Sequence, residues 1–169
     1  MLGYQITHCL VEIKRKASVP FRFLGLFKST TDFETMKSAY GTEKANWCAV
    51  LNVNSTHWVL LFYDVQKELI IFGDSLGMDL AQYNLPLSSA LQIEFGAGNL
   101  VHLPGYPIQE AEARTCGLYV VYWVAELSRG VALPNLAGVF PPNRREDNDR
   151  RVTVWFRRTF PCLCSATWI

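Results

Sequence analysis

The chain has 169 residues and a net charge of +1, from 16 basic and 15 acidic side chains. That is the length of one ordinary domain, and a hydrophobic fraction of 50% excludes an intrinsically disordered chain. The near balance of charge excludes a polycation that coats nucleic acid, and no apolar run approaches the roughly 18–20 residues of a membrane span. We therefore expect one intracellular, monomeric domain over residues 1–169, without a membrane partner.

The first forty residues are predicted to form two helices separated by an apolar segment. The break at Ser18-Val19-Pro20 ends the first helix. Residues 21–27 are apolar and contain Gly25, which is typical of a loop or a short strand. Residues 32–40 have the length of a short helix, ended by Gly41. The apolar stripe of the first helix consists of Ile6, Cys9, Leu10 and Ile13.

Three apolar runs in the middle of the chain predict strands, at residues 47–53, 57–63 and 69–72. Unbroken apolar runs of this length are typical of strands that are buried on both faces. The polar stretch between the second and third runs predicts a hairpin turn. After Gly77 the pattern is less regular until residues 100–103, which we interpret as a further strand.

The last third of the chain is predicted to be mostly helical. The run from Cys116 to Gly130 is too long for a typical strand, so we interpret it as a buried helix. Prolines mark a loop after it, and residues 146–159 form the last predicted helix. The fold class that follows is α+β, a small, mostly antiparallel central sheet flanked by helices.

Four residues of this frame have the chemistry of a thiol hydrolase. Five cysteines are an odd number, so a complete disulfide framework cannot close, and one thiol can serve as a nucleophile. Such a thiol needs a base, a group that orients the base, and a donor that stabilises the oxyanion. Each residue alone has an ordinary structural explanation, and it is the set that favours chemistry. In chain order these residues are His57, Asp74, Gln109 and Cys116.

The predicted hairpin brings His57 and Asp74 to the same face. With its turn centred between Gln66 and Lys67, Asp74 is a diagonal neighbour of His57 across the two strands. Such neighbours lie about 7–8 Å apart, within reach of their side chains. A register slip of one residue would put them on opposite faces, so this pairing is a direct test of the prediction.

The order of these residues separates two classes of cysteine protease. Papain-like enzymes have the cysteine before the histidine, and this chain has the reverse order. Chymotrypsin-like viral cysteine proteases share the order His, acid, Cys, but they are β-barrels and would place Cys116 in a loop before a strand. The helices predicted at both ends of the chain and after Cys116 argue against that class.

The motifs HWVLLFYD, IIFGDSLG and PIQEAEARTCGLYVVYW resemble those of adenain, the adenovirus-type cysteine protease, and fit the wider group that includes the Ulp1-like SUMO proteases. The shared pattern is a His-Trp pair, an acid 17 residues after the histidine, and Gln-x6-Cys-Gly. Segments before the histidine and the basic last helix are similar too, so the resemblance covers residues 21–158.

The resemblance implies a role for each of the four residues. Cys116 would be the nucleophile, His57 the general base and later the general acid, and Asp74 the group that orients His57. Gln109 would donate its side-chain amide to the oxyanion, beside the backbone N–H of Cys116. Adenain typically has a glutamate at the position of Asp74, whereas the Ulp-like relatives have an aspartate there.

The resemblance also implies a class of substrate. Trp58 would cover a narrow channel, and Gly117 would leave room in it for the substrate backbone. A channel that excludes side chains explains why the family favours cleavage sites that contain glycine. Viral members process capsid and core precursors during virion maturation, so we expect viral structural precursors as substrates and the host nucleus and the virion as locations.

Adenain is stimulated by a short viral peptide and by DNA, and this chain departs from adenain on both points. The stretch around Gly98, which corresponds to the place where the peptide is tethered, has no cysteine, so an activating peptide would bind non-covalently. The basic clusters are local, which weakens the case for DNA. Acidic neighbours partly neutralise these clusters, namely Glu146, Asp147 and Asp149.

Two alternative functions remain open. A SUMO or ubiquitin-like deconjugating protease would need a surface that docks the modifier. A catalytically inactive relative that binds DNA or capsid would not need the intact set of four residues. No metal is expected, because Cys162-Leu163-Cys164 has no second pair of ligands at zinc spacing.

Overall fold

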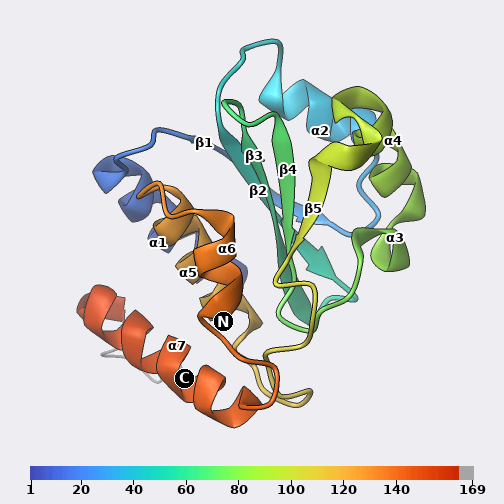
Figure 1. Cartoon of the computed structure of the whole chain (residues 1–169). Helices are drawn as coiled ribbons and strands as arrows, with labels where there is room; N and C mark the ends of the chain where they lie inside the picture. The colour runs from blue at the N-terminus through green and yellow to red at the C-terminus, as the bar shows by residue number, and fades with distance from the viewer. Residues whose placement is uncertain (164–169) are drawn as a thin grey trace.

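A computed structural model describes residues 1–163 of the chain. Five strands form one sheet in the order β1-β2-β3-β4-β5, with helices on both faces (Figure 1). The strands are β1 (Arg22–Lys28), β2 (Trp47–Val53), β3 (His57–Asp64), β4 (Leu69–Gly73) and β5 (Leu100–Leu103). The helices are α1 (Gly3–Lys16), α2 (Phe33–Tyr40), α3 (Leu80–Tyr83), α4 (Leu85–Phe95), α5 (Cys116–Leu127), α6 (Leu133–Gly138) and α7 (Arg145–Thr159), with short 3-10 turns η1 (Ala97–Asn99) and η2 (Pro161–Leu163).

The α+β class is confirmed, and the sheet is mixed. The central pairs β2–β3 and β3–β4 are antiparallel, whereas the edge pairs β1–β2 and β4–β5 are parallel. Parallel neighbours need a crossover connection, which α2 supplies at one edge and α3 with α4 at the other. The expectation of a mostly antiparallel sheet therefore describes its centre, and the two crossovers make both edges parallel.

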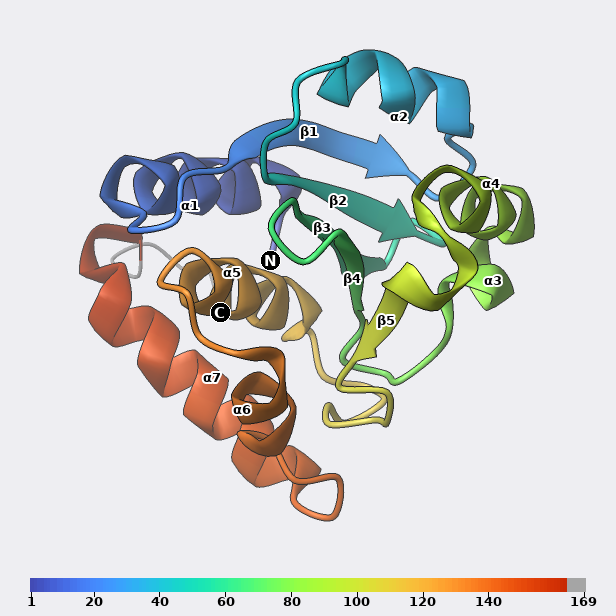
Figure 2. The same cartoon turned by 45° about the horizontal axis from the view of Figure 1, so that its top comes forward.

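The central strands are buried on both faces, as their unbroken apolar runs predicted. Alternate residues of β2 point to opposite sides of the sheet. Cys48 and Val50 join the core that includes α1, α5 and α7, whereas Ala49 and Leu51 join the core that includes α2, α3 and α4. Figure 2 shows these helices as two groups on opposite sides of the sheet. Within the described residues, no helix combines the length and apolar character of a membrane span.

Two regions that lacked a regular pattern are helical. The stretch after Gly77 contains α3 and α4, and the proline-marked loop contains α6. The N-terminus of α4 is well formed, because the side chain of Asn84 accepts the N–H of Leu87 and a proline lies in the first turn. Only Leu87, Ser88 and Leu91 of this helix are buried, which is too narrow a stripe to stand out in the sequence.

The hairpin between β3 and β4 has the predicted register. Asp64 pairs with Leu69 at the turn, and Leu60 pairs with Gly73 at the other end. Gly73 also lets α5 approach the sheet, because a Cβ at this position would lie 2.8 Å from the ring of Trp123. The strand that leads to Asp74 is therefore fixed both by pairing and by the helix packed on it.

Candidate active site

His57 and Asp74 come from neighbouring strands, and their side chains meet. His57 is the first residue of β3 and Asp74 directly follows β4. The Nε2 atom of His57 lies 2.6 Å from Oδ1 of Asp74, the contact that the hairpin register predicted. Only 8% of His57 and 2% of Asp74 is exposed, so water screens this pair little.

The carboxylate of Asp74 accepts three further hydrogen bonds from the chain that follows it. The N–H of Leu76 donates to Oδ1 at 2.9 Å, and the N–H of Met78 donates to Oδ2 at 2.9 Å. The hydroxyl of Tyr83 also donates to Oδ2, at 3.0 Å. Burial and the negative charge of Asp74 raise the pKa of Tyr83, so this hydroxyl keeps its proton. Both carboxylate oxygens are thereby held in one orientation toward His57.

Cys116 is the first residue of α5, and its thiol lies close enough to His57 for each side chain to shift the pKa of the other. Burial alone would raise the pKa of this thiol. The hydrogen bond with His57, the backbone N–H groups of Trp58 and Gly117 and the positive charge of His57 outweigh burial and lower the pKa. The N-terminus of the 12-residue helix adds further positive potential at the sulfur. The site therefore favours the thiolate of Cys116.

His57 carries the complementary proton. Burial alone would lower the pKa of His57, but hydrogen bonds to Asp74 and Cys116, together with their negative charges, raise it to about 9. Because Asp74 occupies Nε2, the other ring nitrogen, Nδ1, is available to Cys116. A thiolate beside an imidazolium is the reactive form of a cysteine nucleophile.

Gln109 lies in the irregular segment between β5 and α5 and is 2% exposed. Its Oε1 atom accepts the hydroxyl of Ser75 at 2.6 Å, and its Nε2 donates to the carbonyl of Ala113 at 2.5 Å. Its backbone N–H donates to the carbonyl of Ser75 at 3.1 Å. Since Ser75 directly follows Asp74, the structure ties Gln109 to the segment that carries the acid.

Asp149 of α7 holds the same irregular segment from the opposite side. Its carboxylate accepts the N–H of Glu110 at 3.0 Å, the hydroxyl of Thr115, and the hydroxyl of Tyr119 at 3.1 Å. Glu110 follows Gln109 in the chain and Thr115 precedes Cys116. The carboxylate of Asp149 thus fixes both ends of the segment that separates those two residues.

Asn148 adds a further contact, and neither Asn148 nor Asp149 was predicted to belong to the site. Asn148 Nδ2 donates to the carbonyl of Ile108 at 3.1 Å. The expectation that Asp149 neutralises surface arginines is corrected, because Asp149 is 9% exposed and turned inward. The sequence does carry a signal, since Asn148 and Asp149 lie one helical turn before Val152, on the buried face of α7. Polar residues on such a face need partners.

The two residues expected at the substrate channel contact the start of the chain. The indole N–H of Trp58 donates to the carbonyl of Met1 at 3.1 Å. A Cβ at Gly117 would lie 2.9 Å from Cβ of Met1 and 3.3 Å from Cδ1 of Ile6. Met1 and Ile6 therefore occupy the place that a side chain at this position would take, so their packing requires a small residue there.

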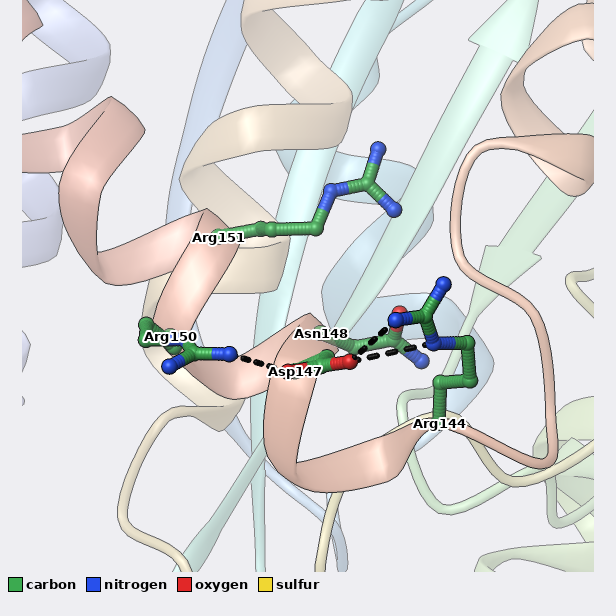
Figure 3. A pocket seen from close by; sticks show the side chains of 5 residues that line it. All are labelled: Arg144, Asp147, Asn148, Arg150 and Arg151. Carbon is green, nitrogen blue, oxygen red and sulfur yellow. Dashed lines mark hydrogen bonds and ion pairs between the residues drawn. The ribbon is translucent and has the colours of Figure 1, made fainter.

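A hollow of about 310 Å³ lies along α7 and contains part of the basic surface (Figure 3). Asp147 pairs there with Arg144 at 2.8 Å and with Arg150. As expected, this acid partly neutralises the cluster. None of the candidate catalytic residues lines the hollow, whose walls are Arg144, Asp147, Asn148, Arg150 and Arg151.

The cysteine-rich C-terminal motif forms no recognisable ligand set in the part of the chain that the structure describes. Cys162 is exposed in η2, and Cys164 lies outside the described residues. Over residues 1–163, no group of three or more His, Cys, Asp or Glu side chains is arranged to hold a metal ion.

No protein-family model and no curated protein matches the chain. Several solved structures do match. The SUMO protease Ulp1 aligns with a TM-score of 0.58 and 20% identity, over 90% of this chain and 73% of that one. The ASFV pS273R protease gives 0.56 and 14%, over 90% of this chain and 65% of that one. The Xanthomonas campestris effector XopD, solved bound to ubiquitin, gives 0.54 and 15%, over 91% and 90%.

At identities this low, the likeness between the structures shows a shared fold and nothing beyond the fold. The chain spans less than two thirds of pS273R but nearly the whole of the XopD chain. The predicted likeness to the wider group is confirmed at the level of fold, and a specific relation to adenain stays a prediction. The fold of this chain, a five-stranded mixed sheet flanked by helices, matches that of the solved cysteine proteases Ulp1 and pS273R and of XopD.

Proposed function

We propose that the chain is a cysteine endopeptidase with Cys116 as its nucleophile. The observation that carries this proposal is the 2.6 Å contact between His57 Nε2 and Asp74 Oδ1, with the Cys116 thiol, whose pKa His57 lowers, at the N-terminus of α5. The lowered thiol pKa and the raised imidazole pKa are the shifts that a thiolate–imidazolium pair requires.

In the proposed reaction, the thiolate of Cys116 attacks the carbonyl carbon of the scissile peptide bond. The resulting oxyanion is stabilised by the backbone N–H of Cys116 and the side-chain amide of Gln109. His57 gives its proton to the leaving nitrogen as the C–N bond breaks, which leaves an acyl-thioester on Cys116. His57 then takes a proton from water, whose oxygen attacks the thioester and releases the acid product and the thiolate of Cys116, which restores the starting thiolate–imidazolium pair.

The proposed substrates are protein precursors, cut at sites that contain glycine during virion maturation. Trp58 and Gly117 are the residues that the family resemblance assigns to the approach to the nucleophile, and Met1, which contacts both, would narrow that approach. A substrate residue without a side chain fits such an approach best. An activating peptide would bind non-covalently, and a polyanion such as DNA would contact the arginines of α7, where Asp147 reduces the charge.

A deconjugating protease for a ubiquitin-like modifier is the second candidate. It is favoured by the solved structures of Ulp1 in complex with Smt3 and of XopD bound to ubiquitin, both of which share the fold. This activity uses the same Cys116 chemistry. It differs in needing a folded modifier that docks outside the channel.

The test is covalent labelling with a short Gly-Gly vinyl sulfone peptide, whose electrophile reacts with an active thiolate. We expect one label per chain, on Cys116, and none in Cys116→Ala. Cys162→Ala is the matched control, because Cys162 is an exposed thiol outside the site and its removal should leave labelling unchanged. A label that persists in Cys116→Ala overturns the assignment of the nucleophile.

A second arm separates the candidates. Ubiquitin and SUMO that carry the same C-terminal vinyl sulfone should label Cys116 no faster than the short peptide does if the chain is an endopeptidase. Labelling that requires the folded modifier would establish deconjugation instead. No labelling by any probe, with the protein folded and iodoacetamide also unreactive at Cys116, would support the inactive relative.

A further inference from the structure

The side-chain amide of Gln109 is held at both ends inside the protein. The hydroxyl of Ser75 donates to Oε1 at 2.6 Å, and Nε2 donates one of its two N–H groups to the carbonyl of Ala113 at 2.5 Å. A glutamine amide has two N–H donors. The contact with Ala113 therefore uses one N–H of Gln109 and leaves the other for the oxyanion role that the proposed function gives it.

These two contacts select one orientation of the amide. With the amide reversed, Oε1 would face the carbonyl oxygen of Ala113, and two acceptors would oppose each other at hydrogen-bond distance. The reversed Oε1 would also lose the hydroxyl of Ser75. An oxyanion needs an N–H donor, so only the observed orientation of Gln109 supports catalysis.

Ser75 also fixes the backbone that carries Gln109. The carbonyl of Ser75 accepts the N–H of Ile108 at 2.9 Å and the N–H of Gln109 at 3.1 Å. Ser75 itself is 1% exposed, so its hydroxyl has no access to bulk water that could replace the bond to Oε1. Its neighbour Asp74 binds His57, and the dipeptide therefore joins the proton-transfer groups to the amide of Gln109.

We propose that Ser75 is a positioning residue for the oxyanion, acting through Gln109. This inference rests on the proposed cysteine protease function. Removal of one oxyanion donor costs about 10²–10³-fold in kcat. Loss of the Ser75 hydroxyl leaves the Gln109 amide in place but no longer fixes its orientation. We therefore expect a fall of about tenfold in kcat, with KM within about twofold of wild type.

The experiment is a double-mutant cycle with Ser75→Ala and Gln109→Ala, read by hydrolysis of a Gly-Gly peptide amide. If Ser75 acts through Gln109, the double variant is as slow as Gln109→Ala alone, because no amide remains to be oriented. Two effects that multiply in the double variant, or a Ser75→Ala rate equal to wild type, overturn the proposal.

A second readout separates positioning from general damage. Iodoacetamide alkylates the thiolate without forming an oxyanion, so Ser75→Ala should be alkylated at Cys116 at the wild-type rate. Equal losses of alkylation and hydrolysis would mean that Ser75 only supports the fold. Ser88→Ala is the matched control, since Ser88 is equally buried but lies in α4, and both of its rates should match wild type.

The variants also keep the result independent of folding and of the proposed function. Ser75→Thr keeps a hydroxyl and should restore most of kcat. If Ser75→Ala does not fold, Ser75→Cys takes its place in the cycle, because a thiol is similar in size and only a weak donor. A wild-type protein that neither labels nor hydrolyses would refute the proposed function itself. An active wild type with a multiplicative cycle would refute only the role of Ser75.

Discussion

The two halves of the candidate site are built in different ways. The proton-transfer half consists of His57 and Asp74 from one hairpin, and the further partners of the Asp74 carboxylate all lie within nine residues after it. The oxyanion half consists of Gln109 and Cys116 at the two ends of an irregular segment. That segment is held by distant residues, Ser75 on one side and the start of α7 on the other.

This difference decides what disturbs each half. A hairpin keeps its register through backbone pairing, so a side-chain substitution in the first half changes chemistry more than geometry. The irregular segment has no strand partner and depends on buried side-chain hydrogen bonds. A substitution there changes where Gln109 and the N–H of Cys116 lie, while leaving the thiolate intact.

The largest effect is expected for Asp74→Asn, which removes the charge that faces His57. We expect kcat/KM to fall on the order of 10³-fold, because an amide at this position no longer favours the imidazolium and holds the ring less well. Steady-state hydrolysis of a Gly-Gly peptide amide measures this fall. Asp64→Asn at the turn of the same hairpin is the control and should stay within about twofold. Activity of Asp74→Asn within tenfold of wild type would contradict the proposed role.

The dependence of the rate on pH should differ between peptide hydrolysis and alkylation of Cys116. Hydrolysis needs the imidazolium, whose pKa is raised to about 9, so the wild-type rate should fall above that pH. Alkylation needs only the thiolate and should not fall there. In Asp74→Asn the alkaline limit should move to lower pH, because the hydrogen bond and charge of Asp74 raise the pKa of His57. An unchanged limit in this variant would contradict the assignment.

Protonation of His57 should also change the free energy of unfolding, in a direction that follows from its raised pKa. Because the folded-state pKa of His57 is raised, the proton that it binds stabilises the folded protein fully below its ordinary pKa of 6.5. That contribution is lost as the pH rises from 6.5 to about 9. Denaturant unfolding of the wild type and of Asp74→Asn across this range should therefore converge toward alkaline pH.

Asp149→Ala should disturb the second half and the fold together. Its carboxylate accepts three hydrogen bonds, so truncation leaves buried donors unsatisfied and should cost about 3 kcal/mol of unfolding free energy. Where the variant is folded, hydrolysis should fall roughly tenfold while alkylation of Cys116 stays near wild type. Asp147→Ala, two residues away and only partly buried, is the control and should change neither rate. If hydrolysis and alkylation fell by the same factor in Asp149→Ala, the oxyanion half would not be independent of the proton-transfer half.

The two halves also differ in how far the sequence predicts them. The register of β3 and β4 follows from apolar runs and one turn, and that register alone places Asp74 beside His57. Gln109 was identified only through a motif, because nothing local marks a buried glutamine in a loop. Ser75 and Asp149 escaped prediction since their partners lie 30 and more residues away, and such pairings depend on tertiary packing.

The start of the chain shows the same limit. The first helix was predicted with its buried stripe, because a 3.6-residue period is a local property. The contact of Met1 with Trp58 and Gly117 was not predicted, since it depends on where α1 docks on α5 and the sheet. From the sequence, Gly117 was therefore assigned one role, as room for the substrate backbone, and the packing of Met1 against it was not predicted.

The smallest effect is expected for Tyr83→Phe, and it tests the difference between the halves most closely. Phenylalanine removes one of the donors to Asp74, while Leu76, Met78 and His57 still hold the carboxylate. We expect kcat to fall about threefold and the alkaline limit of hydrolysis to stay within about half a pH unit, because a single neutral hydrogen bond contributes about 1 kcal/mol or less. The measurement is a full pH–rate profile beside that of Asp149→Ala. If Tyr83→Phe instead slowed hydrolysis as much as Asp149→Ala, without affecting stability, the hairpin half would depend on its side-chain contacts as strongly as the irregular half does.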